Sequence, residues 1–266
     1  MPDRLKILFV GDIIGRPGRR VFRKFIPILR KKYAPDMIVA NGENAAGGIG
    51  ITEKIAQELF TNVDVITSGN HIWDKKEVLD YLDRESYLLR PANYPEGNPG
   101  KGSCVWTEDD GIKIGVISLQ GRVFMEPIDC PFRAADREVA ALRKITPIIL
   151  VDIHAEATSE KQALGWYLDG RVSAVLGTHT HVPTADKRIL PRGTAYMSDV
   201  GMVGGYDSVI GIRKDQALMR FLSSRPQRFE PSRDRGVCST VCITVDSRSG
   251  RALDFQHDIM IEESVD

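Results

Sequence analysis

The feature that most constrains the fold is a repeated alternation of short apolar, β-branched runs with longer segments of helical periodicity. The strand-like runs span residues 5–10, 37–40, 63–67, 112–118, 148–153, 172–176, 194–197 and 237–245. The helix-like segments span residues 17–32, 52–60, 75–82, 134–145, 159–168 and 214–222. Strands that alternate with helices favour an α/β protein. Because the runs near the C-terminus have little helix between them, we expect mixed sheets.

Three local signals refine the helix predictions. Ser159 followed by Gln162 is the pattern of a capping box at the start of one helix. Pro27 predicts that the first helix is kinked or split. Residues 16–32 carry eight basic side chains and no acidic one. Their apolar residues recur at helical spacing, which favours the solvated face of an amphipathic helix over a binding patch.

Chain length and composition exclude several classes of protein. The 266 residues can bury a core without disulfides, and we expect one domain over residues 1–266. Basic and acidic side chains both number 36, so no general attraction to nucleic acid or to an anionic membrane is expected. No apolar run approaches the roughly 20 residues that span a bilayer. Four cysteines without a C-x-x-C pair, and no secretory signal, favour the cytoplasm. The oligomeric state stays open, a homo-oligomer included.

Polar residues of metal-ligand type recur where the strand-like runs end. They are Asp12, Glu43, Asn44, Asn70, His71, His154, His179 and His181. The carboxyl ends of strands in an α/β sheet open onto a common crevice, so these groups could converge on one site. Singly, each has a plainer explanation, such as a turn residue for Asp12 or a satisfied core histidine for His154. Four of the five histidines belong to this set, and we take the fifth, His257, as structural.

The stretch GTHTH, residues 177–181, places His179 and His181 one residue apart directly after an apolar run. In a continuing strand the two side chains would point to opposite faces. If the strand ends there, both can turn toward ions on either side. The spacing suggests two metals in one neighbourhood, and a carboxylate such as Glu43 is a natural bridge between cations roughly 3.5–4 Å apart.

The ligand chemistry points to hydrolysis of a phosphoester. Imidazole, carboxylate and amide oxygen without thiolate suit Mn, Fe, Zn or Ni better than a structural zinc site. Cys238 and Cys242 lie four apart in a predicted strand, which favours core positions over metal ligation. Two ions would supply a hydroxide near neutral pH and clamp phosphoryl oxygens. His71, next to the candidate ligand Asn70, is placed to protonate the leaving oxygen.

The order of these motifs resembles the calcineurin-like binuclear metallophosphoesterase superfamily. The motifs GDIIGRPG, NGENAAGG, GNHIWDKKE, RPANYPEG, HAEATSEK and GTHTHVPTAD more closely resemble the bacterial YmdB-type cyclic-nucleotide phosphodiesterases, over residues 5–211. The resemblance implies a four-layer αββα sandwich of two mixed β-sheets flanked by helices. It implies that one metal is held by Asp12, Glu43, Asn44 and His181, and the other by Glu43, Asn70, His154 and His179. It also implies that His71 is the catalytic acid.

Two departures from the wider superfamily bear on the metals. The usual D-x-H motif reads Asp12-Ile13-Ile14, so an imidazole ligand is missing and Asn44 would have to replace it. The usual bridging aspartate is Glu43. The resemblance favours iron or manganese as the two divalent ions, while zinc or nickel stays open.

The resemblance supplies the substrate class, a cyclic nucleotide such as 2′,3′- or 3′,5′-cyclic AMP. Residue chemistry alone supports only a phosphoester hydrolase. A phosphomonoesterase or nuclease on the same metals is one alternative. Another is a regulatory protein that binds a nucleotide or an RNA-processing partner and turns over slowly. The presence of His71 argues against this alternative, because a protein that only binds has no use for an acid. Residues 90–102, with three prolines and three glycines, form either a lid or binding loop or a surface excursion.

Overall fold

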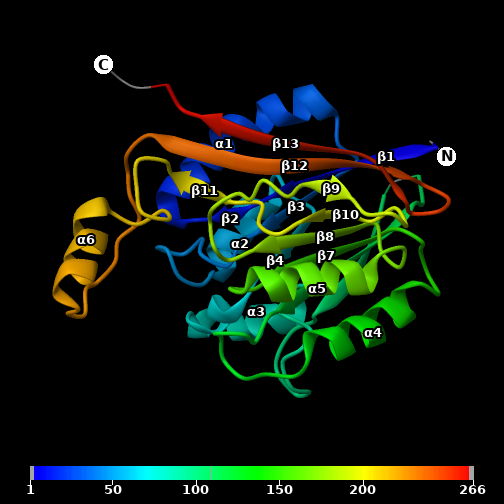
Figure 1. Cartoon of the computed structure of the whole chain (residues 1–266), viewed down its shortest axis with the longest axis horizontal. Helices are drawn as coiled ribbons and strands as arrows, with labels where there is room; N and C mark the ends of the chain where they lie inside the picture. The colour runs from blue at the N-terminus through cyan, green and yellow to red at the C-terminus, as the bar shows by residue number, and fades with distance from the viewer. Residues whose placement is uncertain (1–2, 109, 264–266) are drawn as a thin grey trace.

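Two mixed β-sheets pack face to face in the computed structural model, which describes residues 3–108 and 110–263 (Figure 1). Along the first sheet the strands are β2 (Asp12–Ile13), β11 (Met202–Gly205), β12 (Gly236–Asp246), β1 (Arg4–Val10), β3 (Met37–Asn41) and β4 (Val65–Thr67), with β13 (Ala252–Ile261) also paired to β12. Along the second sheet they are β5 (Ser103–Thr107), β6 (Lys113–Gln120), β7 (Ile149–His154), β8 (Ala174–Thr178), β10 (Ala195–Met197) and β9 (Arg188–Ile189).

Each sheet contains a block of parallel strands. In the first sheet β1, β3 and β4 run parallel, and β12 joins β1 in the antiparallel direction. In the second sheet β6, β7, β8 and β10 run parallel, and β5 and β9 are antiparallel edges. Polar side chains that follow the parallel strands therefore gather at the carboxyl edge of each block.

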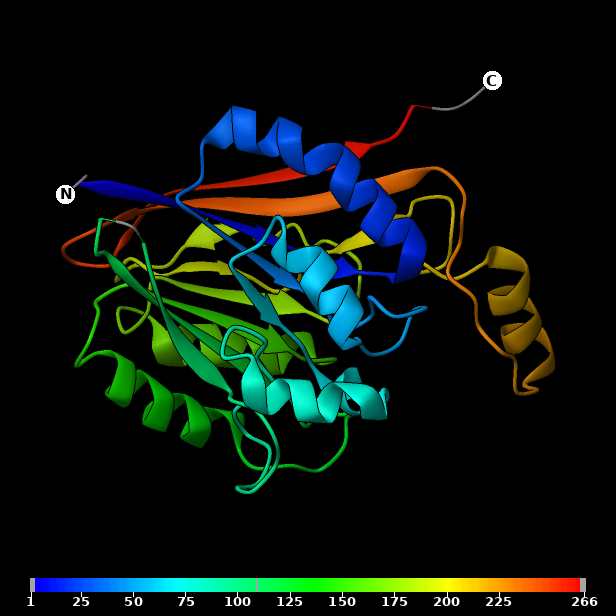
Figure 2. The same cartoon turned by 180° about the vertical axis from the view of Figure 1, so that it is seen from behind.

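Helices cover the outer face of each sheet (Figure 2). The first sheet carries α1 (Gly15–Tyr33), α2 (Glu53–Phe60) and α3 (Leu79–Arg84), with the 3₁₀ turns η1 (Asn70–Trp73) and η2 (Lys76–Val78). The second carries α4 (Pro131–Leu142) and α5 (Thr158–Leu168). One buried cluster joins Phe22 and Leu29 to β1, and another joins Leu164 to the second sheet. A third cluster fills the space between the sheets. The αββα sandwich and the mixed sheets are confirmed.

The predicted strands were found, but some short or edge strands were missed. Residues 63–67 contribute only Val65–Thr67 to β4. The sequence analysis missed β2, β5, β9, β11 and β13. The sequence of β13, ALDFQHDIMI, mixes charged with apolar residues because much of the strand is exposed. Such a strand is recognised only once β12 provides its partner.

One of the local helix predictions is wrong, and another is confirmed as a bend. The capping box at Ser159 is wrong, because α5 begins at Thr158 after Ala157, and no side chain caps it. Helix α1 is not split at Pro27 but continues through it, and Figure 2 shows its axis bending. The basic residues of α1 form the expected surface face. Arg20 lies 2.7 Å from Glu262, and Arg23 lies 3.1 Å from Glu58.

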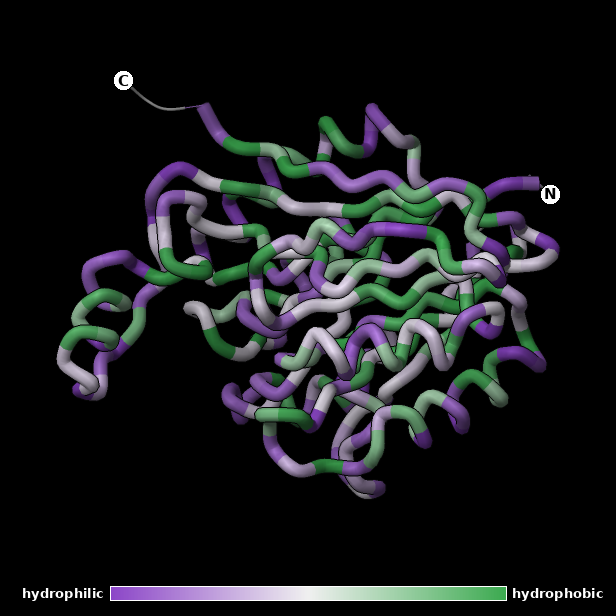
Figure 3. Tube along the Cα trace, in the orientation of Figure 1, coloured by the Kyte–Doolittle hydropathy of each residue, from purple (hydrophilic) through white to green (hydrophobic). Residues whose placement is uncertain are grey.

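Helix α6 (Lys214–Ser223) differs from the other helices because it projects from the body of the molecule (Figure 1). Figure 3 shows its mixed hydropathy. Phe221 and Leu222 are 79% and 85% exposed. None of the helices in residues 3–108 and 110–263 is long and apolar enough to cross a bilayer.

Candidate metal centre

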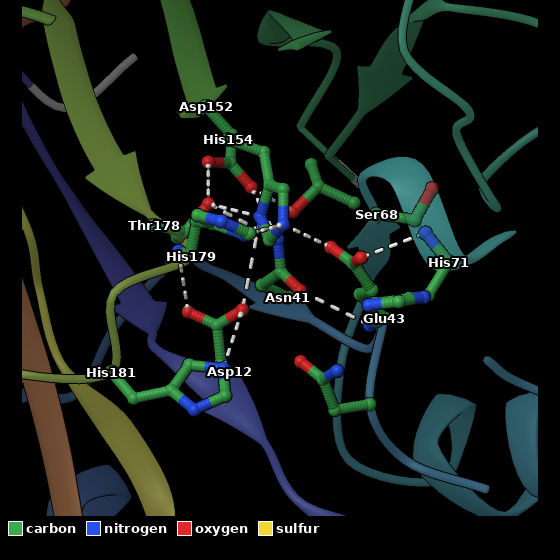
Figure 4. A network of polar contacts seen from close by, with 12 residues as sticks. Asp12, Asn41, Glu43, Ser68, His71, Asp152, His154, Thr178, His179 and His181 are labelled. Carbon is green, nitrogen blue, oxygen red and sulfur yellow. Dashed lines mark hydrogen bonds and ion pairs between the residues drawn. The ribbon is translucent and has the colours of Figure 1, made fainter. Parts of the chain in front are cut away.

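The polar residues predicted at the strand ends gather at one edge of the sandwich (Figure 4). Asp12 opens β2 just after β1, and Glu43 and Asn44 follow β3. Asn70 and His71 open η1 after β4, His154 ends β7, and His179 and His181 follow β8. Asp12 and Glu43 are 0% exposed and His154 is 1% exposed. The strand order thus places residues from both sheets in one buried cluster.

Four buried oxygens in this cluster have no hydrogen-bond partner within the described residues. They are Asp12 Oδ1, Glu43 Oε2, Asn44 Oδ1 and Asn70 Oδ1. Leaving a buried acceptor unpaired costs about 1–3 kcal/mol, so such atoms are rare without a role. They belong to the four oxygen-bearing residues that the sequence proposed as ligands. Ligand atoms of Asp12, Glu43 and His154 also lie within 4.8 Å of one another. The residues present therefore fit a cation site.

The hydrogen bonds of His154 decide which ring nitrogen faces Glu43. The hydroxyl of Thr178 donates to Asp152 Oδ1 at 2.8 Å, so it can only accept from His154 Nδ1 at 2.9 Å. His154 Nε2 is then the ring nitrogen that faces Glu43 Oε2, with which it forms a buried ion pair. A metal cation bound between this nitrogen and the carboxylate would take the place of the proton that lies there.

The other two histidines are oriented in the same way. Nε2 of His179 lies 3.2 Å from Glu156, while its Nδ1 lies 2.9 Å from His154 Nε2. Nδ1 of His181 donates to the carbonyl oxygen of Ile210 at 2.9 Å. This leaves Nε2 of His181 free, 3.9 Å from Asp12 Oδ1. Both ring nitrogens of His179 thus have a neighbour in this structure, and Nε2 of His181 faces the buried carboxylate of Asp12.

The end of β8 explains how two histidines one residue apart reach the same site. The strand stops at Thr178, and His179 and His181 then adopt φ angles of 99° and 65°. Positive φ in a residue other than glycine costs of order 1–3 kcal/mol and persists only where the surroundings impose it. The strand thus ends before both histidines, which is the condition under which the two side chains can turn toward one site.

A buried ion pair holds this turn in place. Asp199 accepts hydrogen bonds from the backbone N–H and the hydroxyl of Thr180, at 3.0 and 2.8 Å. Lys161 of α5 donates to Asp199 at 2.9 Å and to the carbonyl of Thr178 at 2.7 Å. Both charged residues are 1% exposed. Lys161 and Asp199 thus fix the backbone on both sides of His179.

Close packing explains the glycine in the motif GNH. A Cβ atom on Gly69 would collide with the ring of His154 and with Glu43 Oε2. Only glycine lets the chain pass this close to the two candidate ligands. The same motif therefore supplies both the candidate ligand Asn70 and the space that His154 and Glu43 occupy.

The cluster strongly perturbs the ionisation of its own residues. Burial opposes protonation of His154, but the carboxylates of Glu43, Asp12 and Asp152 outweigh it and raise the pKa of His154 to about 9. Burial and the neighbouring His154 lower the pKa of His179 to about 3. Burial also raises the pKa of Asp12, against the effects of His181 and His154. Buried carboxylates that draw a proton onto His154 would bind a cation in its place.

His71 lies beside this cluster but is more accessible. Its backbone N–H donates to Glu43 Oε1 at 2.8 Å, and its Nδ1 lies 2.6 Å from Asp74 Oδ2. Its side chain is 34% exposed. The supporting residues Asp74, Asp152, Thr178, Lys161 and Asp199 were not predicted from the sequence. Asp74, Thr178 and Lys161 do stand inside the quoted motifs GNHIWDKKE, GTHTHVPTAD and HAEATSEK, whereas Asp152 and Asp199 stand in none of the motifs quoted above.

Comparison with known proteins now places this architecture in a family. The family model described as YmdB-like protein matches residues 8–257. The chain belongs to the YmdB-like family. It is 48% identical over 260 residues to a Bacillus subtilis protein named 2′,3′-cyclic-nucleotide 2′-phosphodiesterase, and the alignment covers 97% of this chain and 98% of that protein.

Two solved structures share the fold of this YmdB-like chain. A hypothetical protein from Thermus thermophilus has a TM-score of 0.90 and 43% identity, over 97% of this chain and all (100%) of that one. A protein described as a novel phosphatase from Mycoplasma pneumoniae has a TM-score of 0.92 and 34% identity, over 99% of this chain and 95% of that one. The family resemblance deduced from the motifs is therefore confirmed.

Proposed function

We propose that this protein is a metal-dependent phosphodiesterase that hydrolyses cyclic nucleotides of the 2′,3′- or 3′,5′-cyclic AMP type. The observation that carries the proposal is a buried cluster at the strand ends. In it, ligand atoms of Asp12, Glu43 and His154 lie within 4.8 Å of one another, and four carboxylate and amide oxygens have no hydrogen-bond partner among the described residues. Membership of the YmdB-like family and 48% identity to a named phosphodiesterase make the chain a phosphoric diester hydrolase.

The proposed centre has two ion positions that share Glu43. Asp12, Asn44 and His181 belong to one position, and the other is formed by the candidate ligands Asn70, His154 and His179. Divalent ions bound there, iron or manganese by the family resemblance, would supply Lewis acidity toward a phosphoryl group and activate water as a nucleophile. Both positions draw on carboxylate, amide and imidazole groups without thiolate, which suits these metals.

His71 would act as the acid in this reaction. Asp74 accepts the hydrogen bond from His71 Nδ1, so the proton available for transfer is held at Nε2. For a 2′,3′-cyclic substrate, the oxygen of water attaches to phosphorus while the bond from phosphorus to O2′ breaks. O2′ takes the proton from His71 Nε2, and a 3′-phosphate remains. The attacking water gives up one proton to solvent, and His71 is protonated again before the next turnover. We infer this bond from the name of the Bacillus subtilis relative.

A substrate panel tests the proposal. Metal-loaded protein is incubated with 2′,3′-cyclic AMP, 3′,5′-cyclic AMP, p-nitrophenyl phosphate and single-stranded RNA, with and without a chelator. We expect chelator-sensitive hydrolysis of a cyclic nucleotide with the highest kcat/KM of the set. Hydrolysis confined to the monoester or to RNA would instead favour the phosphomonoesterase or nuclease alternative.

The proposal also covers the partners, the location and the oligomeric state of the enzyme. Its substrate is a small phosphodiester, and no general nucleic-acid partner is expected from a formal net charge of zero. All four cysteines are free, in keeping with a cytoplasmic location. A homo-oligomeric state stays a prediction.

A further inference from the structure

A second group of side chains lies beside His71 and has no role in the proposed bond-breaking step. Trp73 ends η1 two residues after His71, Tyr94 belongs to the loop of residues 90–102, and Gln120 ends β6. The rings of Trp73 and Tyr94 meet edge to face, with centroids 5.0 Å apart and planes at 74°. The hydroxyl of Tyr94 donates to Gln120 Oε1 at 2.9 Å. Three separate segments thus meet in one group.

The strand register places Gln120 next to the candidate metal centre. Gln120 of β6 is paired with His154 of β7, and neighbouring strands lie about 4.8 Å apart. The hydroxyl of Ser118 donates to the carbonyl of Ser68 at 2.9 Å, which turns that face of β6 toward the segment before η1. Side chains two residues apart on a strand share a face, so Gln120 points the same way. Gln120 therefore lies between His154 and the turn that carries His71.

Within the side-chain amide of Gln120, the oxygen accepts a hydrogen bond from Tyr94, but the nitrogen does not donate one to any described residue. Gln120 is 0% exposed, and its Nε2 has no hydrogen-bond partner among the described residues. A buried donor without a partner destabilises the fold, whereas an apolar side chain of similar size would not. An amide at this position is explained if Nε2 donates to a bound substrate.

The loop of residues 90–102 holds Tyr94 in place and is not free to act as a lid at this end. The Asn93 amide donates to the carbonyl of Gln120 at 2.7 Å and accepts from the Gln120 backbone N–H at 2.9 Å. The backbone N–H of Ala92 donates to the carbonyl of Ser118 at 2.8 Å. This part of the loop runs along the edge of β6. The hydrogen bonds therefore hold Tyr94 in a fixed position beside that strand.

We infer that Trp73, Tyr94 and Gln120 form the subsite for the nucleoside part of the substrate, an inference that rests on the proposed function. Both rings are half-buried, so each keeps exposed surface against which a base can pack. Every nucleobase has a face that stacks on an aromatic ring, and one well-placed polar group fixes its orientation. Gln120 Nε2 supplies that polar contact. The group adjoins His71, and the base of a nucleotide must lie near its own phosphodiester.

The test compares a substrate that has a nucleoside with one that has none. Wild-type protein, Tyr94→Leu and Gln120→Leu are loaded with manganese and assayed on 2′,3′-cyclic AMP and on glycerol 1,2-cyclic phosphate. Tyr167→Leu is the matched control, because Tyr167 makes a similar edge-to-face contact with Phe132, at 5.4 Å and 74°, on the helices over the second sheet. Manganese content and adenosine binding by calorimetry are measured for each protein.

We expect Tyr94→Leu and Gln120→Leu to lower kcat/KM for 2′,3′-cyclic AMP by roughly 5- to 100-fold and to weaken adenosine binding in parallel. Their rate on glycerol 1,2-cyclic phosphate and their manganese content should stay within about twofold of wild type. Equal losses on both substrates, or wild-type rates on both, would overturn the subsite. If wild-type protein binds adenosine through these residues yet hydrolyses neither diester, the subsite stands and the proposed function fails.

Discussion

The candidate metal centre and the turn that carries His71 and Asp74, here called the rim, are built differently, although both lie at the carboxyl ends of parallel strands. Asp12, Glu43 and His154 are 0–1% exposed, and their atoms are held by further buried groups. The side chains of His71 and Asp74 are 34% and 43% exposed and belong to a short turn. From this difference we infer that the buried centre binds the metal ions, whereas the more exposed rim contacts the substrate.

The largest expected effect comes from removing charge at the middle of the centre. Glu43→Gln keeps nearly the same volume but removes the carboxylate that would lie between two cations, which then repel each other. We expect metal content and hydrolysis to fall together. Loss of a residue that only hydrogen-bonds a metal ligand lowers metal affinity by roughly 10- to 100-fold, and loss of Glu43 should lower it by more. Folding, followed by circular dichroism, should survive.

A matched carboxylate tests whether position matters more than charge. Glu156, like Glu43, faces a histidine, in this case His179, but the side chain of Glu156 is 51% exposed. Glu156→Gln should keep its metal and its rate within a few-fold of wild type. If Glu43→Gln also kept both metals and full rate, Glu43 would have only a structural role.

On the rim, the effect of a mutation should depend on the substrate. His71→Asn should lower the rate on a cyclic nucleotide by roughly 10²–10⁴-fold, because a ribose oxygen leaves poorly without a proton. On bis-p-nitrophenyl phosphate the loss should be much smaller, since nitrophenolate leaves unprotonated. Metal content should not change. Equal losses on both substrates would mean that His71 orients the phosphoryl group, and lost metal would make it a ligand.

The buried support of the centre should appear in stability as well as in activity. Lys161→Met removes the only side chain of opposite charge that the structure places on Asp199 within the described residues, although Thr180 still donates hydrogen bonds to it. Breaking a buried ion pair costs about 3–5 kcal/mol in the free energy of unfolding. The exposed pair Arg171 and Asp136 provides the control, because both side chains are about one-third exposed, at 36% and 34%. Arg171→Met should cost about 0–1 kcal/mol in urea unfolding. Similar costs for the two variants would contradict the role given to Lys161.

The smallest expected effect is at the outer edge of the rim. Asp74→Asn keeps the His71 ring and weakens only the contact to its Nδ1. Because Asp74 is exposed, the lost interaction is screened, and we expect a loss of only about 5- to 10-fold on a cyclic nucleotide. Steady-state kinetics with both substrates would measure it. A loss as large as that of His71→Asn would show that the acid depends on Asp74 for its function.

The polar residues that cluster at the strand ends were easier to predict from the sequence than the residues that support them, and the reason is physical. Ligand types such as Asp12 and His154 stand directly after strand-like runs, so local pattern and sheet geometry locate them together. Lys161 and Asp199, which hold the turn at His179, lie on a helix before that turn and on a loop after it. Nothing in the local pattern marks Lys161, a charged residue of α5, as buried.

The same limit applies to the fold. The parallel strands were predicted because a strand buried on both faces is an almost continuous apolar run. The edge strand β13 was missed because its charged residues face solvent, and its identity depends on pairing with β12. The capping box at Ser159 failed because the N-cap of α5 is Ala157, two residues before the serine of the motif.

The most direct test of the central claim is a titration of metal-free protein with manganese, in which bound metal and hydrolysis of 2′,3′-cyclic AMP are measured in the same samples. The buried centre should bind close to two ions per chain, and activity should appear mainly as the second ion binds. Full activity without metal, or activity that saturates with one ion per chain, would contradict a binuclear centre bridged by Glu43.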